Sequence, residues 1–314
     1  MKAVLIDKPT KAEEIELSEV AIPSVKDGWV LVKVKAFGIN HSEKLLRTFE
    51  INNDYIKKPI IPGIECVGEI VNQSDSGFEK GDKVIALMGG MGRSFNGSYA
   101  EYVLLPTNNV FRIESSLSWE ELGAIPETYF TAWGSLFECL RIKKDDVLLV
   151  RGATCALGYA AIKIAKALGV KMIGTTHKKD KLSLLNECDE VILDDGNLCG
   201  KVRADKVLEL IGPKTLRDSL KCLYRGGTVC QTGLLGGVYT LDGFDPIKEI
   251  PNGCYLTGFF SNFPTQEIID EMFAFFNAKH LQPSIGKVYD FKDIRKALTD
   301  IDEHKVEGKV IIKV

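Results

Sequence analysis

A short run of small residues carries the clearest chemical signal in the sequence. Residues 152–158 read Gly-Ala-Thr-Cys-Ala-Leu-Gly and lie between a predicted buried strand, 147–150, and an amphipathic helix that ends before Gly169. At such a junction, free backbone N–H groups and the positive end of the helix can bind a phosphate. This turn is poor in glycine, so a plain strand–helix connection is the alternative. The candidate phosphate-binding residues are Ala153, Thr154, Cys155, Ala156 and Leu157.

The end of the next predicted strand, 171–175, indicates which dinucleotide would bind. Folds specific for NAD hold the ribose diol with an acidic residue at this point. Here the strand tip has no acid, and three lysines follow it, which suits a 2′-phosphate. We therefore predict NADP(H) as the cofactor, bound by Thr176, Lys178 and Lys181. A solvated lysine run is the alternative, and Asp180 could instead mark the ribose.

Further candidate cofactor-binding residues stand at the ends of two later strands. They are inferred from position alone, because open α/β sheets bind ligands at the carboxyl ends of their strands. Gly233, Leu234 and Leu235 follow the fifth predicted strand of this series. Phe259 and Phe260 end the sixth, where they could pack on a nicotinamide or, equally well, in the core.

These candidate residues can gather at one edge of a parallel sheet if strands and helices alternate along the chain. We predict strands at 147–150, 171–175, 190–193, 205–210, 228–232 and 255–260, and helices at 157–168, 180–186 and 215–223. This alternation is typical of a parallel sheet covered on both faces. The first third instead holds short β-like segments separated by turn residues. A helix at 268–277 and a strand at 309–314 close the chain, and we expect that strand to return to the β-rich domain.

Bulk properties restrict the possible functions. A chain of 314 residues exceeds one ordinary core, so two domains are expected. The formal net charge of −3 argues against nucleic-acid and membrane-surface binding, and no apolar run is long enough to span a membrane. Eight cysteines without a Cys-x-x-Cys pair, and an N-terminus that reads as a strand, indicate reduced thiols in a cytoplasmic protein.

Several motifs, in order and spacing, resemble the medium-chain dehydrogenase/reductase superfamily in its zinc-free quinone oxidoreductase branch. They are residues 38–43, 62–70, 81–84, 97–102 and 125–133, and the similarity covers nearly the whole chain. The resemblance implies an α/β protein with a GroES-like β-rich domain, residues 1–115 and 271–314. A Rossmann domain with a doubly wound parallel sheet, residues 116–270, would bind the cofactor. It also implies a homodimer, for which segment 255–260 could supply a sheet edge.

The same resemblance argues against a metal. Asn40, Ile64 and Glu127 stand where the related zinc alcohol dehydrogenases carry Cys, His and Cys, and the 89–96 loop has no cysteine for a structural zinc. A catalytic zinc needs three good ligands, and an aliphatic side chain cannot ligate. Without a Lewis acid, alcohol oxidation is disfavoured and an electron-poor acceptor is favoured.

Family positions also imply roles for individual residues. Asn40 would lie beside the nicotinamide and donate to an acceptor oxygen, with a backbone-bonded turn residue as the alternative. Thr131 would lie near the nicotinamide or cap a helix. Lys309, in a Gly-Lys pair near the C-terminus, could reach the phosphates, with a lysine that simply flanks the final strand as the alternative. The sequence departs from the family at Asp194-Asp195, which replace a tyrosine that contacts the cofactor and bring acids near the adenosine end.

The predicted function is hydride transfer from NADPH to a small-molecule quinone or activated enone, without a metal. A second departure, aliphatic Leu45 and Ile51 in place of a substrate-facing tyrosine, leaves the substrate open. The alternatives are an enoyl reductase that acts on acyl thioesters and a non-catalytic NADPH-binding redox sensor.

Overall fold

The computed structural model describes residues 1–73 and 77–314, and the chain forms two compact units. Unit 1 comprises Met1–Glu127 and Asn262–Val314, and unit 2 comprises Thr128–Ser261. The limit at Glu127 lies within helix α3 (Pro126–Trp133). The sequence predicts domain limits at 115/116 and 270/271, whereas the compact units divide at 127/128 and 261/262. The domain limits themselves remain a prediction.

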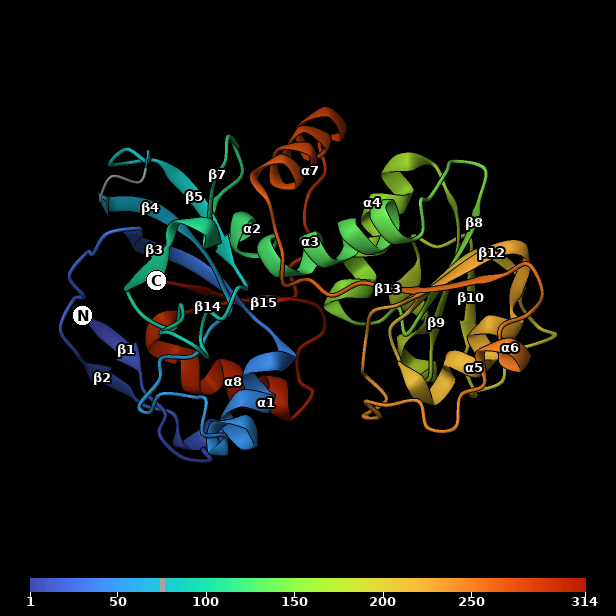
Figure 1. Ribbon diagram of the computed structural model, residues 1–314, viewed down its shortest axis with the longest axis horizontal. Coiled ribbons are helices and arrows are strands. Elements are labelled where there is room, and N and C mark those ends of the chain that lie inside the picture. Colours follow the sequence, from blue (N-terminus) through green and yellow to red (C-terminus); the bar gives the residue numbers. More distant parts are fainter. Residues whose placement is uncertain (74–76) are drawn as a thin grey trace. The chain divides into compact units, whose positions relative to one another are not determined.

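Unit 1 is built on a mixed, mainly antiparallel sheet in the order β14-β15-β3-β4-β5-β7, with β6 paired to β3 off this path (Figure 1). The long strand β3 (Trp29–Ile39) pairs along its length with β4 (Glu65–Gln73). Its first residues also pair with β6 (Tyr102–Pro106), and its last residues pair with β15 (Val310–Lys313). The prediction that the final strand returns to the β-rich part is therefore confirmed.

Unit 1 has an apolar core, in which the rings of Phe37 and Tyr99 stack at 4.8 Å. The remaining strands of the main sheet are β5 (Lys83–Leu87), β7 (Val110–Arg112) and β14 (Lys287–Asp290), and β1 (Lys2–Val4) pairs with β2 (Leu17–Glu19) in a separate two-stranded sheet. The helices are α1 (His41–Thr48), α2 (Trp119–Gly123), α7 (Gln266–Lys279) and α8 (Ile294–Asp302), with short 3-10 turns at Ala12–Glu14, Glu50–Asn52, Thr107–Asn109 and Phe291–Asp293.

Unit 2 contains a parallel sheet in the order β10-β9-β8-β11-β12-β13 (Figure 1). Its strands are β8 (Val147–Arg151), β9 (Lys171–Thr176), β10 (Glu190–Leu193), β11 (Ala204–Glu209), β12 (Leu223–Gln231) and β13 (Tyr255–Gly258). Its helices are α4 (Ala156–Leu168), which packs on β8 and β9, α5 (Pro213–Lys221), which packs on β11 and β12, and α6 (Pro246–Glu249). A π-helical turn, η4 (Gly134–Cys139), and a 3-10 helix, η5 (Lys179–Leu185), complete it.

The strand order reverses between β8 and β11, because β9 and β10 extend the sheet on one side and β12 and β13 on the other. The predicted doubly wound parallel sheet is therefore confirmed. Ligands of such sheets bind at the carboxyl ends of the strands, at the point of reversal. This topology directs attention to the loops that follow β8 and β11.

Two local predictions need correction. The segment predicted as a helix at 180–186 is the 3-10 helix η5, in which only Leu185 is buried, too small an apolar face to hold an α-helix. The fifth strand begins at Leu223 rather than 228, since the pairing of β12 with β11 shifts register across Gly226-Gly227. All eight cysteines are free thiols. Across residues 1–73 and 77–314, no helix combines the length and apolarity needed to cross a membrane.

Candidate functional site

The turn after β8 is fixed to β9 by hydrogen bonds. Gly152 has a φ of +84°, which glycine adopts without strain. The Gly152 N–H donates to the Thr175 hydroxyl at 3.2 Å, and the Ala153 N–H donates to the Thr175 carbonyl oxygen at 2.8 Å. The hydroxyl groups of Thr154 and Thr176 lie 3.1 Å apart. The structure thus brings the first predicted phosphate-binding residues to the end of β9.

Helix α4 begins at this turn. Gly158 lies so close to the turn that a Cβ there would be 2.3 Å from the Ala153 carbonyl oxygen, which explains the glycine. The Cys155 sulfur accepts a hydrogen bond from the Gly158 N–H at 3.3 Å, and burial raises the pKa of this thiol. Among the described residues, nothing accepts from the N–H groups of Thr154 and Ala156. These amides at the helix N-terminus are donors available to an anion, so the turn fits a phosphate group.

The predicted 2′-phosphate residues are the last residue of β9, Thr176, and two lysines that follow this strand. The buried Thr176 hydroxyl contacts the Thr154 hydroxyl and accepts from the Lys178 N–H at 3.3 Å, so Thr176 holds the turn together. The side chains of Lys178 and Lys181 are half-buried, whereas Asp180 is exposed. Two ammonium groups therefore follow β9, the strand to which the phosphate turn is hydrogen-bonded.

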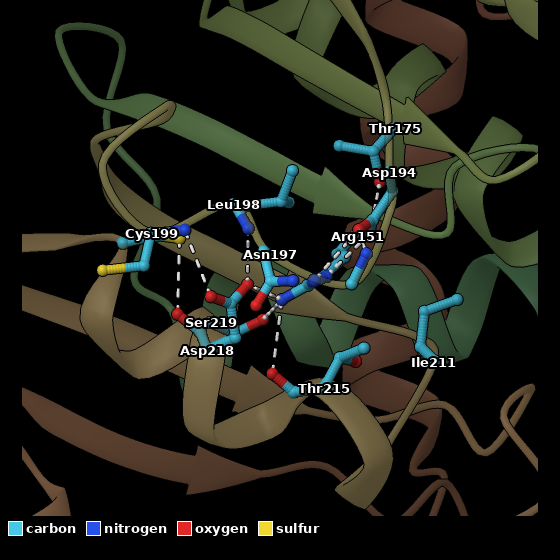
Figure 2. A network of polar contacts seen from close by, with 12 residues as sticks. Arg151, Thr175, Asp194, Asn197, Leu198, Cys199, Ile211, Thr215, Asp218 and Ser219 are labelled. Atoms are coloured by element: carbon cyan, nitrogen blue, oxygen red, sulfur yellow. Dashed lines mark hydrogen bonds and ion pairs between the residues drawn. The ribbon is translucent and has the colours of Figure 1, made fainter.

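Arg151, the last residue of β8, lies at the centre of a buried polar network that sequence reasoning missed (Figure 2). Its Nε and Nη2 donate to the two carboxylate oxygens of Asp194, at 2.8 and 3.0 Å. Its Nη1 donates to Asp218 at 2.7 Å, to the Ser219 hydroxyl at 3.0 Å and to the Thr215 carbonyl oxygen at 3.2 Å. One guanidinium therefore joins β8 to the segment after β10 and to helix α5.

This network and a neighbouring ion pair show which groups bind the two acids that the sequence places near the adenosine end, Asp194 and Asp195. The Asp194 side chain is only 8% exposed, and its carboxylate also accepts from the Gly196 N–H at 2.8 Å. Asp195 is exposed and pairs with Lys201 at 2.7 Å. Both carboxylates have cationic partners inside unit 2, so neither is an uncompensated charge at the strand ends.

The loops after β11 and β12 lie against each other at the carboxyl edge of the sheet. The Gly233 N–H donates to the Glu209 carbonyl oxygen at 3.0 Å, and the Leu235 N–H donates to that of Leu210 at 3.1 Å. A Cβ on Gly233 would lie 2.2 Å from the Leu210 carbonyl oxygen. Leu234 and Leu235 are 42% and 53% exposed, so this edge presents accessible apolar side chains.

Thr131 is connected to the end of β12 through Ser135, a residue of the π-helical turn that the sequence did not single out. The Ser135 hydroxyl donates to the Thr131 carbonyl oxygen at 2.7 Å and lies 2.9 Å from the Thr232 hydroxyl. Turns of this kind recur at functional sites. The only sequence signal was the spacing of Ser135, four residues after Thr131.

Phe259 packs within unit 2 on the glycine of the same turn. A Cβ on Gly134 would lie 2.0 Å from the Phe259 ring, which also meets the Phe130 ring edge-on at 5.7 Å. Phe260 is 70% exposed. Of the two alternatives predicted for these residues, the structure shows Phe259 in internal packing and leaves Phe260 as the accessible ring.

In unit 1, Asn40 belongs to a buried charged cluster. Its Nδ2 donates to Oε1 of Glu65 at 2.8 Å, and the Lys309 ammonium donates to Asn40 Oδ1 and to Glu65 Oε1, each at 2.5 Å. The Glu65 and Lys309 side chains are 0% and 2% exposed. The expectation that Lys309 reaches the phosphates is therefore wrong, because its ammonium is enclosed by acceptors of unit 1.

Glu43 fixes the backbone beside this cluster. Its carboxylate accepts from the N–H groups of Asn40, at 2.7 Å, and of Ile64, at 3.1 Å. Burial raises the Glu43 pKa to about 7; the positive charge of Lys309 opposes the rise and Glu65 adds to it. Within the parts of the chain that the structure describes, no group of three or more His, Cys, Asp or Glu side chains could hold a metal ion.

Sequence comparison shows the family. The family described as "Alcohol dehydrogenase GroES-like domain" matches residues 26–115, and "Zinc-binding dehydrogenase" matches residues 187–312. The quinone oxidoreductase of Sus scrofa is 30% identical over 330 residues, which cover 99% of this chain and 97% of the pig protein. The chain belongs to the quinone oxidoreductase-like family of medium-chain dehydrogenases/reductases. As a member of this family, it is an oxidoreductase with a nicotinamide cofactor.

Solved structures share the fold of this chain. An NAD-dependent alcohol dehydrogenase, 25% identical, matches with a TM-score of 0.85 over 100% of both chains. A mycobacterial protein solved in complex with NADPH, 22% identical, matches with a TM-score of 0.83, again over 100% of both chains. The predicted fold class, a GroES-like domain with a Rossmann-type parallel sheet, is confirmed.

Proposed function

We propose that this oxidoreductase uses NADPH to reduce a quinone or an activated enone by hydride transfer, without a metal. The observation that carries the proposal is the phosphate turn. It combines free amides of Thr154 and Ala156 at the start of α4 with half-buried Lys178 and Lys181 after β9. Relatives that are 30% identical over nearly their whole length are named quinone oxidoreductases, which supports this acceptor class.

The preference for NADPH rests on charge at the end of β9. Structures with this fold include one named for NAD and one solved with NADPH, so the fold alone does not decide between them. The strand ends at Thr176 without an acid to hold a ribose diol. Lysine ammonium groups attract a phosphate, and the bond between Asp194 and Arg151 keeps that carboxylate from opposing it.

Hydride addition leaves an anion on the acceptor, which takes its proton from solvent, so the protein's own contribution is orientation. When bound, the nicotinamide supplies the hydride, and the protein contributes positioning and hydrogen bonds. We propose that Asn40 donates from Nδ2 to the acceptor oxygen on which negative charge develops. Thr131, linked through Ser135 to the end of β12, would support the nicotinamide side of the site.

Steady-state assays test the proposal directly. NADPH oxidation is followed with 1,4-benzoquinone, 9,10-phenanthrenequinone, an enone and crotonyl-CoA, each with and without a chelator. Chelator-resistant turnover of a quinone or enone supports the proposal. A strong preference for crotonyl-CoA would instead assign an enoyl reductase, and tight NADPH binding without any turnover would assign a redox sensor. If calorimetry detects no NADPH binding, the quinone or enone reductase, the enoyl reductase and the redox sensor are all contradicted.

We also propose that the protein is a homodimer joined through β13. This strand is an edge of the parallel sheet, and Tyr255 at its start is 61% exposed. An unpaired strand edge can pair with a second copy of itself. Sedimentation should give a dimer that Gly258→Pro converts to a monomer, because the N–H of the neighbouring Phe259 faces β12, so that of Gly258 faces the open edge and proline removes it.

A further inference from the structure

Lys309 is a buried lysine whose ammonium has two side-chain acceptors. Its ammonium is 2% exposed and donates to Asn40 Oδ1 and Glu65 Oε1. Gly38 makes room for this pair, since a Cβ there would lie 2.2 Å from Lys309 Cε and 2.5 Å from Glu65 Oε1. An uncompensated buried charge is costly, so the burial of this lysine depends on both acceptors.

These two partners settle which way the Asn40 amide faces. An amide group can ordinarily be turned over, because its oxygen and nitrogen are nearly alike in shape. Lysine can only donate, so it requires Oδ1, and a carboxylate only accepts, so Glu65 requires Nδ2. Exchanging the two atoms would face the ammonium with an N–H donor and the carboxylate with an oxygen. The pair therefore selects one orientation of the amide.

The Nδ2 group of Asn40 has two hydrogens, and one of them is used by Glu65 at 2.8 Å. No residue within 1–73 or 77–314 accepts the other, and Asn40 is half-buried. An ammonium on the amide oxygen also draws electron density from the nitrogen, which strengthens the remaining N–H as a donor. The free hydrogen is thus both oriented and polarised.

We propose that Lys309 is a positioning residue for hydride transfer, which holds Asn40 so that its free N–H donates to the acceptor oxygen. This inference rests on the proposed function. Lys309 acts through Asn40 and not on the acceptor itself, because its own ammonium is enclosed. Glu65 completes the clamp and also accepts from the Glu127 N–H at 2.6 Å.

A double-mutant cycle tests the proposal. Lys309→Met should lower kcat for the quinone by about tenfold to a hundredfold, with KM changed less than about threefold. In an Asn40→Ala background, the same substitution should lower kcat by no more than about twofold, because the residue through which it acts is already gone. Equal effects in both backgrounds, or no effect in either, would overturn the proposal. Lys313→Met, at the end of the strand that follows Lys309 but 56% exposed, is the matched control and should leave kcat unchanged.

A second measurement does not depend on turnover. In protein with 15N-labelled asparagine, the Asn40 side-chain amide pair is assigned by its loss in Asn40→Ala. In Lys309→Met this pair should shift and exchange faster with solvent, while Lys313→Met leaves it in place. An unmoved pair in Lys309→Met would overturn the clamp even if the enzyme turns over. If the wild type shows the Asn40 amide resonances but reduces no acceptor, only the proposed function is contradicted.

If Lys309→Met alone does not fold, Lys309→Met with Glu65→Gln removes both charges and leaves an acceptor for the Glu127 N–H. The double-mutant cycle with Asn40→Ala is then repeated with Lys309→Met/Glu65→Gln in place of Lys309→Met, and the Asn40 amide resonances are measured in the same protein. The expected results are again a lower kcat that requires Asn40 and a shifted amide pair. An unchanged amide pair would again overturn the proposal.

Discussion

Arg151 and Asp194 form two parallel hydrogen bonds, of 2.8 and 3.0 Å, at the end of the sheet that carries the phosphate turn. The next residue after Arg151 is Gly152, which begins that turn. A guanidinium matches a carboxylate in this fork geometry better than any other side chain. The pair therefore joins the strand that leads into the turn to the residue that follows β10, and compensates the Asp194 charge.

Replacing Arg151 should be strongly destabilising. Arg151→Met would leave Asp194 and Asp218 mostly buried without their cation, which costs about 3–5 kcal/mol when one partner of a buried pair is removed. Urea unfolding measures the loss. Lys201→Met breaks the exposed pair with Asp195 and should change the free energy of unfolding by less than about 1 kcal/mol. Equal losses in the two variants would contradict a structural role for the network.

Removing the two lysines after β9 should affect NADPH and not NADH. Lys178→Ala with Lys181→Ala removes the positive charges proposed to pair with the 2′-phosphate, so the Kd for NADPH should rise about tenfold to a hundredfold. The Kd for NADH should change less than about twofold, since NADH has no such phosphate. Fluorescence titration measures both. Lys179→Ala, on an exposed neighbouring residue, is the control, and an equal loss of affinity for both cofactors would argue against the assignment.

The sequence predicted those features that depend on local pattern. The turn between β8 and α4 follows from small residues placed between a buried strand and an amphipathic helix ending at Gly169, whose φ is +73°. The return of β15 to β3 follows from one apolar strand at the end of the chain. In both cases neighbours along the chain carry the physical signal.

Features that depend on distant charges could not be predicted. Arg151 is separated from Asp218 by 67 residues, and Lys309 from Glu65 by 244. A lone arginine at a strand end, or a lysine beside a final strand, looks the same whether it is exposed or buried. The role expected for Lys309 was wrong for this reason, since its place was inferred from a short Gly-Lys match and its partners lie far along the chain.

The close approach at the start of α4 should make Gly158 indispensable. In Gly158→Ala the new methyl group would lie 2.3 Å from the Ala153 carbonyl oxygen, so the helix or the turn must shift. We expect a loss of a few kcal/mol in the free energy of unfolding, about the cost of overpacking, together with weaker NADPH binding. Gly258→Ala provides the comparison, because its methyl group would meet only the Gln231 oxygen, at 3.3 Å. Chemical unfolding and an NADPH titration of both variants decide the matter.

The buried carboxyl of Glu43 should make stability depend on pH. Its pKa in the folded protein is about 7, raised above the ordinary value of 4.5 by burial. The folded state therefore holds a proton that the unfolded state releases, and stability falls as the pH rises from about 4.5 to about 7. At about 1.4 kcal/mol for each pH unit between these values, the decrease is about 3 kcal/mol.

Glu43→Gln mimics the protonated carboxyl and should remove this component of the pH dependence. Chemical unfolding at several pH values between 5 and 8 should show the wild type losing stability relative to the variant, mainly below pH 7. Glu13→Gln, at an exposed position, should run parallel to the wild type. Parallel curves for Glu43→Gln and the wild type would mean that Glu43 is ionised throughout this range. The Asn40 N–H would then donate to an ionised Glu43 carboxylate at every pH in this range. The position of Asn40 would not depend on protonation of Glu43.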